Sequence, residues 1–449
     1  MENNKKIFGK SNWIILLLFG TVGQIAWSVE NMFFNLFAYN IYPDLDTVTL
    51  MVQLSGIVAT VVTLIAGTLS DKTGNRRAFI SWGYLIWGVT VALFGCLSTE
   101  LTMTLFGLDE ARAITVTLAM VVIGDCVMTL FGSTANDAAF NAWVTDNTTH
   151  GNRGTVEGVL SILPLIALLI VAGGFGILKD LLGGFRNLFI LLGVGMSAVG
   201  AYGIFKVRDA EHLERSGNFR DILYGFKPSV IKKNLPFYVT LIIVLVYGIA
   251  CQIFMPYLII FMTTYLGFET LEYSLVFGVA ILGGAAVNLY LTRLSDRMDK
   301  SRLLYFATAT LAVGLVGMYF ASMIRAKIAL LILFGIGGFV MICGYIFVNA
   351  LCGSTVRDNT PTEAVGKLQG VRMVFSVLIP MLVGPAIGNA INSARGILIE
   401  NPGADAMTTE YIPAPEIFLA GAAFCLLIFA VIPFLSRLTK AKEGIAGSN

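Results

Sequence analysis

Charged residues are scarce in this chain. They make up 13% of its 449 residues, whereas hydrophobic residues make up 56%, and the mean hydropathy is +0.80. An ordinary soluble domain has a charged fraction of about 25%. No stretch of the sequence has the polar surface that soluble domains require. The composition therefore excludes a soluble protein and indicates a chain that crosses a membrane many times.

The residue types that catalysis and metal binding require are also scarce or badly spaced. The two histidines, His150 and His212, lie in polar stretches, which excludes a histidine proton relay inside the membrane. All six cysteines lie in apolar runs without metal-ligand or disulfide spacing. We find no nucleophile–base arrangement, phosphate loop or metal-ligand cluster, so we expect neither an enzyme nor a bound cofactor or metal. The net charge of +2 gives no reason to expect nucleic acid as a partner.

Apolar runs of membrane length fill most of the chain. A helix needs about 20 mostly apolar residues to cross the hydrocarbon layer. The run that starts at Trp13 is too long for a cleaved signal peptide, so we expect it to be retained as the first span. We predict an all-α membrane protein with twelve transmembrane helices, at residues 13–40, 48–70, 78–98, 113–143, 156–178, 184–205, 237–265, 272–293, 303–324, 328–356, 368–394 and 416–436.

Two charged motifs occur twice, in the same order. The stretch Leu69-Ser-Asp-Lys72 returns 225 residues later as Leu294-Ser-Asp-Arg297, and Asp146-Asn-Thr148 returns 212 residues later as Asp358-Asn-Thr360. Each copy lies between apolar runs. The repeats predict a duplicated protein with two pseudo-symmetric six-helix bundles, at residues 1–205 and 237–449, joined by a basic linker at 206–236.

The distribution of lysine and arginine predicts the orientation. If both termini are cytoplasmic, the inner segments carry 23 of the 30 basic residues and the outer loops carry six. Cytoplasmic loops are enriched in Lys and Arg. We therefore predict a multi-pass protein of the cell (inner) membrane, with cytoplasmic N- and C-termini and a cytoplasmic linker.

The two bundles, the basic linker and the loop Gly67-Thr-Leu-Ser-Asp-Lys-Thr-Gly-Asn-Arg-Arg77 resemble the major facilitator superfamily along essentially the whole chain. The Asp146 and Asp358 loops and the acids inside the spans resemble its glycoside–pentoside–hexuronide:cation symporter branch, the melibiose-carrier type. This resemblance implies alternating access, spans 1, 4, 7 and 10 lining a central cavity, and a monomer. It also implies that the charged loops gate the cytoplasmic side; the residues concerned are Asp71, Arg76, Arg77, Asp146, Asp296, Arg297, Arg302 and Asp358.

Few ionisable residues lie inside the spans, and because burying each one costs several kcal/mol, each is a candidate for a functional role. Asp125 is central in span 4 and Glu30 lies in span 1, and we assign both to cation or proton coupling, with a helix–helix hydrogen bond as the alternative. The resemblance to the melibiose-carrier type implies a cation site with acids on spans 2 and 4, but span 2 has no acid here, so we favour a proton over sodium as the coupling ion. At about 100° per residue, Asp137 points about 120° away from the Asp125 face, and we expect it to make a structural contact.

Polar and aromatic side chains on spans 1, 4, 7, 10 and 11 are candidates for substrate binding. Trp27 could stack on a sugar ring, and Arg372 could pair with an acid such as Glu157 or hold an anionic substrate group. For each residue the alternative is ordinary packing or interhelical hydrogen bonding. The candidates are Gln24, Trp27, Asn31, Asn136, Gln252, Tyr345, Asn349 and Arg372.

These features predict a secondary active symporter that moves a sugar, a glycoside or a similar small polar solute with a proton or sodium ion. The alternative within the same fold is an exporter of amphipathic compounds or a lysolipid transporter. A membrane sensor that does not transport would carry a signalling extension, which the short stretch after Phe434 does not provide. Two smaller expectations concern the helices: Pro256 bends span 7, and Gly384-Pro-Ala-Ile-Gly388 packs closely on a neighbour.

Overall fold

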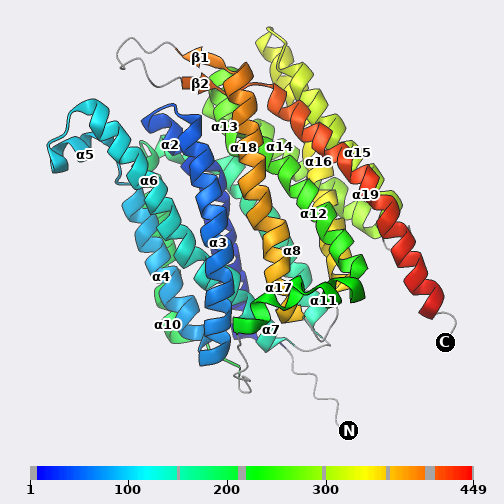
Figure 1. The fold of residues 1–449 in the computed structure, drawn as a ribbon. Coiled ribbons are helices and arrows are strands. Elements are labelled where there is room, and N and C mark those ends of the chain that lie inside the picture. Colours follow the sequence, from blue (N-terminus) through cyan, green and yellow to red (C-terminus); the bar gives the residue numbers. More distant parts are fainter. Residues whose placement is uncertain are drawn as a thin grey trace. The chain divides into compact units, whose positions relative to one another are not determined.

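The computed structural model describes residues 8–148, 152–210, 219–295, 300–360, 365–399 and 410–446. It divides into two compact units, Met1–Phe219 and Arg220–Asn449, and their boundary falls inside the predicted linker. Within the described residues, twelve helices are long and apolar enough to cross a membrane. The predicted fold class, an all-α membrane protein with twelve spans, is therefore confirmed (Figure 1).

The first unit contains six spans, several of which change from α- to π-helical geometry along their length. Its elements are α1 (Lys10–Val29), η1 (Glu30–Phe34), α2 (Asn35–Ile41), α3 (Leu45–Thr73), α4 (Arg76–Phe94), α5 (Thr99–Phe106), α6 (Glu110–Gly132), η2 (Ser133–Phe140), α7 (Asn141–Asn147), α8 (Arg153–Ile170), η3 (Val171–Phe175), α9 (Gly176–Leu181) and α10 (Phe185–Lys206). The segments η1, η2 and η3 are π-helical and continue the helix before them.

The second unit contains the other six spans and a small hairpin. Its elements are η4 (Phe219–Phe226), α11 (Pro228–Lys233), α12 (Leu235–Phe254), η5 (Met255–Tyr257), α13 (Leu258–Ile260), η6 (Phe261–Tyr265), α14 (Thr270–Ser295), α15 (Lys300–Ala321), α16 (Lys327–Asn359), α17 (Val365–Met373), η8 (Val374–Leu378), α18 (Ile379–Arg395), β1 (Ile397–Ile399), β2 (Glu410–Ile412) and α19 (Glu416–Ala446).

The predicted spans agree with these helices to within a few residues, but one outer helix was not predicted. The helix α5 lies between spans 3 and 4, in a stretch that was expected to be a loop. Ser98 caps its first turn by accepting a hydrogen bond from the Leu101 N–H, and Gly107 ends it in the left-handed conformation at φ 64°. Both are ordinary helix boundary signals, but eight residues are too few to stand out in a search for membrane-length helices.

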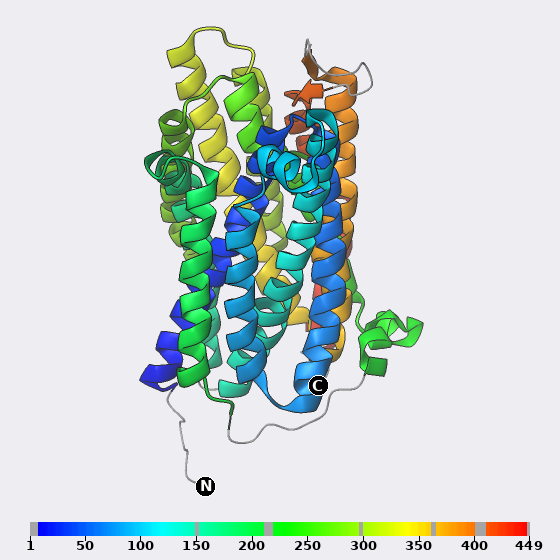
Figure 2. The same ribbon diagram turned by 90° about the vertical axis from the view of Figure 1, so that its left-hand side faces the viewer.

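Glycines bring α4 and α10 into backbone contact in the first unit, where the two helices lie side by side (Figure 2). A Cβ atom at Gly193 would lie 2.4 Å from the Gly88 carbonyl oxygen, and one at Gly88 would lie 2.3 Å from the Gly193 carbonyl oxygen. Lipid tails are as apolar as side chains, so helices in membranes associate through close packing of this kind. Both glycines are therefore required by the packing of spans 3 and 6.

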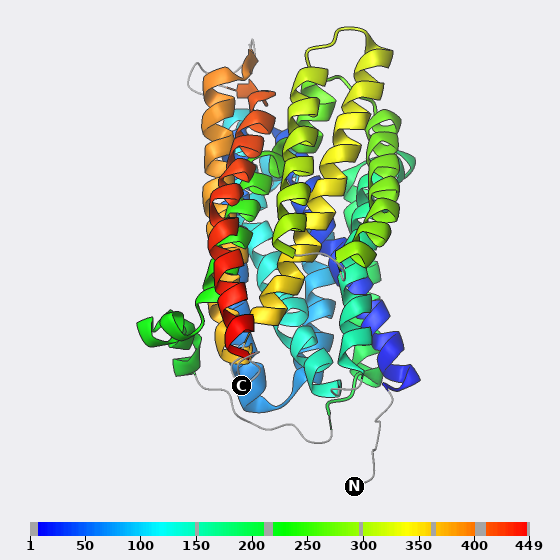
Figure 3. The same cartoon turned by 90° about the vertical axis from the view of Figure 1, so that its right-hand side faces the viewer.

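Glycines also allow close contact between helix backbones in the second unit. A Cβ atom at Gly344 of α16 would lie 2.3 Å from the Leu311 backbone nitrogen of α15, and Figure 3 shows these helices side by side. A Cβ atom at Gly388 of α18 would lie 2.2 Å from the Ile253 carbonyl oxygen of α12, so close packing of the Gly384–Gly388 stretch is confirmed. Pro256 lies in the 3-10 turn that interrupts span 7, as expected.

The hairpin β1–β2 follows α18, inside the predicted outer loop at 395–415. Its strands are antiparallel, with Ile397 opposite Ile412 and Leu398 opposite Tyr411. The buried side chain of Asn392, at the end of α18, accepts a 2.9 Å hydrogen bond from the Ala414 N–H. The loop end that leads into α19 is thereby attached to α18. Residues 400–409 lie outside the described residues.

Candidate functional site

A cluster of two carboxyl and two hydroxyl groups lies inside the first unit. The Thr129 hydroxyl of α6 donates to Glu30 Oε1 at 3.0 Å and lies 3.3 Å from Ser55 Oγ of α3. The Ser55 hydroxyl in turn donates to the Asp125 carboxylate. Hydrogen-bonded oxygens therefore connect Glu30 of span 1 to Asp125 of span 4 through span 2.

All four side chains are almost completely buried. Their exposed fractions are 7% for Glu30, 3% for Ser55, 1% for Asp125 and 0% for Thr129. Within the described part of the chain, Glu30 Oε2 and Asp125 Oδ1 have no hydrogen-bond partner, and neither acid forms an ion pair. A buried carboxylate without a compensating charge costs several kcal/mol. The cluster must therefore hold protons or a cation to be stable.

The local helix geometry places Asp125 and Glu30 in the same cluster. Asp125 shares the buried face of α6 with Thr129 and Gly132, as the helical period predicted, and Asn136 extends that face into η2. Glu30 is the first residue of the π-helical segment η1. π-helical segments are rare and occur frequently at functional sites. The hydroxyls of Ser55 and Thr129 link Glu30 to Asp125, so the structure brings together the two residues assigned to coupling, a role that remains a prediction.

The expected direction of Asp137 is wrong. It lies in η2, where the helix turns less per residue than an α-helix does, so a calculation at 100° per residue rotates it too far. Asp137 instead lies beside Trp27 of α1, whose ring also borders Gly132 on the Asp125 face. Its carboxylate accepts from Ser133 at 3.3 Å and from the Asn136 amide at 3.2 Å.

The substrate candidates of the first unit occupy different environments. Gln24 and Trp27 are half-buried, and the Trp27 ring packs on Trp87 with centroids 5.1 Å apart. Asn31 is exposed and donates to the Trp27 carbonyl oxygen at 2.8 Å. Asn136 is buried, and its Oδ1 lies 2.8 Å from the Tyr84 hydroxyl. Their role in binding a solute stays a prediction.

The candidates of the second unit lie on three spans. Gln252 on α12 is half-buried, and its side chain borders Gly384 of α18. Tyr345 on α16 is half-buried, and its carbonyl oxygen accepts from the Tyr247 hydroxyl at 3.1 Å. Asn349 on α16 and Arg372 on α17 are exposed. The side chain of Glu157, the suggested partner of Arg372, lies outside the described residues.

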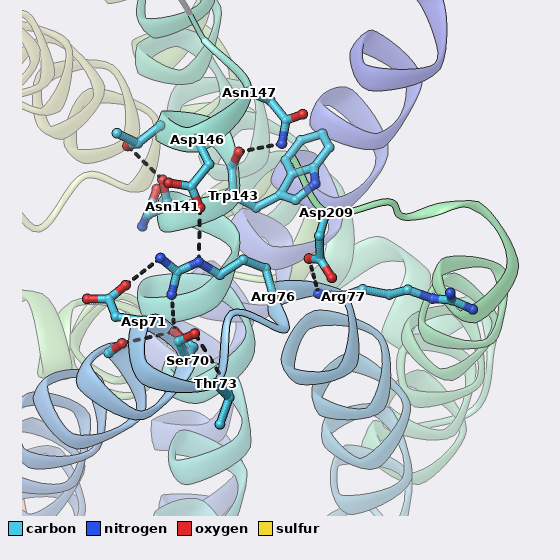
Figure 4. A network of polar contacts seen from close by, with 12 residues as sticks. Ser70, Asp71, Thr73, Arg76, Arg77, Asn141, Trp143, Asp146, Asn147 and Asp209 are labelled. Carbon is cyan, nitrogen blue, oxygen red and sulfur yellow. Dashed lines mark hydrogen bonds and ion pairs between the residues drawn. The ribbon is translucent and has the colours of Figure 1, made fainter. Parts of the chain in front are cut away.

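The charged loop after span 2 forms a buried polar network in the first unit (Figure 4). Arg76 is 5% exposed. Its guanidinium donates to Asp146 Oδ2 at 3.0 Å and to Ser70 Oγ at 2.6 Å, and it forms an ion pair with Asp71. A planar guanidinium with five donors suits several acceptors at once. Arg76 thus joins the ends of α3 and α7.

The turn that presents Arg76 is built from its neighbours in sequence. Gly74 ends α3 at φ 64°, and the Asn75 side chain caps α4 by accepting from the Ala78 N–H. The Arg77 N–H donates to Asp209 Oδ1 at 2.8 Å, so the start of the linker is attached to the same turn (Figure 4). The side chain of Arg77 is exposed.

The equivalent loop of the second unit is only partly described. Lys300 Nζ lies 2.5 Å from Asp358 Oδ2, which joins the start of α15 to the end of α16. The side chains of Lys300 and Asp358 are 39% and 59% exposed, and Arg302 is exposed. Asp296 and Arg297 lie outside the described residues. A gating role for these loops in both units stays a prediction.

Three participants were not among the predicted site residues. Ser55 and Thr129 bridge the two acids, and Ser70 completes the coordination of Arg76. Single hydroxyl residues are common in membrane helices and give no signal of their own. Thr129 could have been found, because it lies one helical turn from Asp125 on the same face, but Ser55 required knowledge of how spans 2 and 4 pack.

The fold and the site define a polytopic membrane protein made of two six-span units, with buried acids in the first. Within that class, the chain belongs to the Major Facilitator Superfamily, whose sequence profile matches residues 13–385. It is therefore a transporter rather than an enzyme. No curated protein matches the chain at a significant level.

Solved structures with a similar fold come from several kinds of transporter. A point mutant of the nucleoside transporter NupG superposes with a TM-score of 0.66 at 12% identity, covering 94% of this chain and 99% of that one. An inward-facing, occupied bacterial homologue of the lysosomal transporter Spinster gives 0.63 at 13%, covering 94% and 96%. An inward-facing bacterial homologue of the iron transporter ferroportin gives 0.60 at 13%, covering 94% and 98%. At these identities the likeness shows the fold alone.

Proposed function

We propose that this transporter is a cation-coupled symporter of a sugar, a glycoside or a similar small polar solute, of the glycoside–pentoside–hexuronide:cation type. The observation that carries the proposal is the buried cluster of Glu30, Ser55, Asp125 and Thr129. Its two acids have unpartnered oxygens and no basic partner among the described residues. A site of this kind is stable only while it holds a proton or a cation, so its occupancy can be linked to a conformational change.

The same geometry supports one choice of coupling ion over the other. Sodium and other hard cations require several oxygen ligands around one point. The two free carboxylate oxygens and two hydroxyls could supply four, but both hydroxyls already donate to a carboxylate. A proton needs one oxygen only, and desolvation favours the neutral form of a carboxyl group. We therefore favour the proton, and alternating access by relative movement of the two units would carry the solute.

Support for a polar solute comes from the half-buried and exposed amide, indole and phenol groups already described on spans 1, 7 and 10. The solved structures with a similar fold belong to transporters of several kinds and do not narrow the solute class, so nucleosides and the amphipathic alternative are both included in the test. The charged network at Arg76 would gate the cytoplasmic side. The protein would function as a monomer in the cell membrane with both termini cytoplasmic.

The test is uptake into proteoliposomes under separately imposed proton and sodium gradients, with labelled monosaccharides, disaccharides, nucleosides and lysophospholipid. We expect a sugar or glycoside to accumulate under one gradient. Asp125→Asn should abolish accumulation but retain exchange of labelled for unlabelled solute, because exchange does not require net cation movement. The control is Glu100→Gln, an exposed acid on α5. Uptake of lysophospholipid alone, or accumulation that Asp125→Asn leaves intact, would refute the proposal.

A further inference from the structure

The buried acid pair has no direct access to water. Glu30 and Asp125 are 7% and 1% exposed, yet a coupling site must gain and lose its proton in every transport cycle. A proton moves between groups that are within hydrogen-bond reach or are bridged by a water molecule. Some intermediate group must therefore connect the pair to solvent.

A ladder of polar side chains leads away from the pair along span 4. Asp125, Thr129, Ser133 and Asp137 follow each other at intervals of four residues. One such interval leaves two side chains as neighbours on a helix face, and the wider π-helical turn of η2 reduces the rotation that three intervals would accumulate in an α-helix. The Thr129 hydroxyl donates to Glu30, and the Ser133 hydroxyl donates to Asp137 at 3.3 Å. The ladder thus ends at a third carboxyl group.

Asp137 differs from the other two acids in its exposure. It is only half-buried, and the side chain of the next residue along the helix face, Asn141, is exposed and donates to the Asp137 carbonyl oxygen at 3.1 Å. The π-helical segment η2 begins at Ser133 and turns Asp137 onto the ladder, where regular α-helical geometry would have turned it away. Asp137 is therefore placed between the buried pair and the exposed end of the span.

The groups that face Asp137 from neighbouring helices leave its charge uncompensated. Glu30 of η1 and Tyr84 of α4 lie within electrostatic range of Asp137, and the Trp27 indole of α1 lies beside it. No lysine or arginine among the described residues forms an ion pair with Asp137. The two described side chains that donate hydrogen bonds to its carboxylate, Ser133 and Asn136, are neutral.

We propose that Asp137 is the proton-exchange group that connects the Glu30–Asp125 pair to solvent. In this step the O–H bond of the Asp137 carboxyl group breaks, a bridging water molecule accepts that proton and gives up one of its own to the Glu30 carboxylate, and the charged Asp137 takes the next proton from solvent water. The reverse sequence releases the proton. This inference rests on the proposed function, in that it gives the acid pair a proton to exchange, but it makes no assumption about the transported solute.

The experiment follows protonated carboxyl groups directly, without a solute. The purified full-length protein, in a detergent that has no ester groups, is transferred rapidly into D2O, and time-resolved infrared spectroscopy records the conversion of COOH to COOD. Glu30→Gln and Asp125→Asn identify the bands of the buried pair. We expect Asp137→Asn to slow the exchange of those bands by about tenfold or more, since a positioned acid–base group contributes factors of about 10² to 10⁴.

Control variants separate a proton relay from a structural role. Glu100→Gln, which removes an exposed acid on α5, should leave the exchange rate unchanged. Asp137→Glu keeps a carboxyl group and should retain fast exchange, even if Asp137→Asn folds poorly. Unchanged exchange in folded Asp137→Asn, or equally slow exchange in Asp137→Glu, would overturn the proposal. Absence of bands that respond to Glu30→Gln or Asp125→Asn would instead refute proton coupling itself.

Discussion

Two glycines on the same helix should respond in opposite ways to one substitution. Gly193 of α10 is buried against α4, and a Cβ atom there would lie 2.4 Å from the Gly88 carbonyl oxygen and 2.7 Å from the Ala92 backbone nitrogen. Gly195, two residues later, is exposed and has no atom within 4 Å of such a position. Changing each to alanine adds the same methyl group to the same helix, so Gly195→Ala is a matched control.

The structure sets the magnitude of this difference. Optimal contacts between carbon and other heavy atoms are about 3.5–4.0 Å, so α4 and α10 must separate by about 1 Å to accept Gly193→Ala. Overpacking costs about 1–3 kcal/mol, and the upper end applies because both neighbours are backbone atoms that cannot rotate away. Alanine is favoured over glycine within a helix by about 1 kcal/mol. We expect Gly193→Ala to destabilise by about 2 kcal/mol and Gly195→Ala to stabilise by up to about 1 kcal/mol.

The assay is thermal unfolding in detergent, followed by intrinsic fluorescence at one fixed scan rate. For a unit of about 200 residues, 1 kcal/mol corresponds to about 2–4 °C, so the two variants should differ by about 6–12 °C. The double variant Gly88→Ala with Gly193→Ala should lose less than the sum of the single losses, because one separation of the helices relieves both contacts. Equal midpoints for Gly193→Ala and Gly195→Ala would refute the close approach of α4 and α10.

Three further predictions use the same unfolding assay. Arg76→Lys should lower the free energy of unfolding by about 1–3 kcal/mol, because a single ammonium cannot replace the hydrogen bonds of the buried guanidinium. Arg77→Lys, at an exposed side chain, should lower it much less. Equal losses of stability would contradict the network of Figure 4. Lys300→Ala should cost less than about 1 kcal/mol because its ion pair is largely exposed, and a larger loss would show that this contact is better shielded than the structure indicates. Thr129→Val keeps the shape of the side chain but removes the donor to Glu30, so it should cost about 1–3 kcal/mol; a neutral effect would show that the hydroxyl bridge does not form.

The span pattern was predictable because hydropathy and charge are local properties of the chain. All twelve spans, the duplicated loops and the basic linker were read from runs of neighbouring residues, and the structure contains twelve corresponding helices. The short helix α5 escaped prediction because its length is well below that of a span. The predicted direction of the Asp137 side chain was wrong because the calculation assumed α-helical geometry throughout. No residue type in Ser133–Phe140 indicates the change to a π-helix.

The order of residues was enough to predict twelve spans and a duplication of the two halves, and it shows that very few acids lie within the spans. Which of these acids meet depends on how the helices pack. Glu30 and Asp125 are far apart in the chain, and the hydroxyls of Ser55 and Thr129 join them through contacts between three spans. The physical reason is that burial in lipid depends on composition along one helix, whereas contacts between helices depend on where small residues and π-helical turns allow their backbones to approach and rotate.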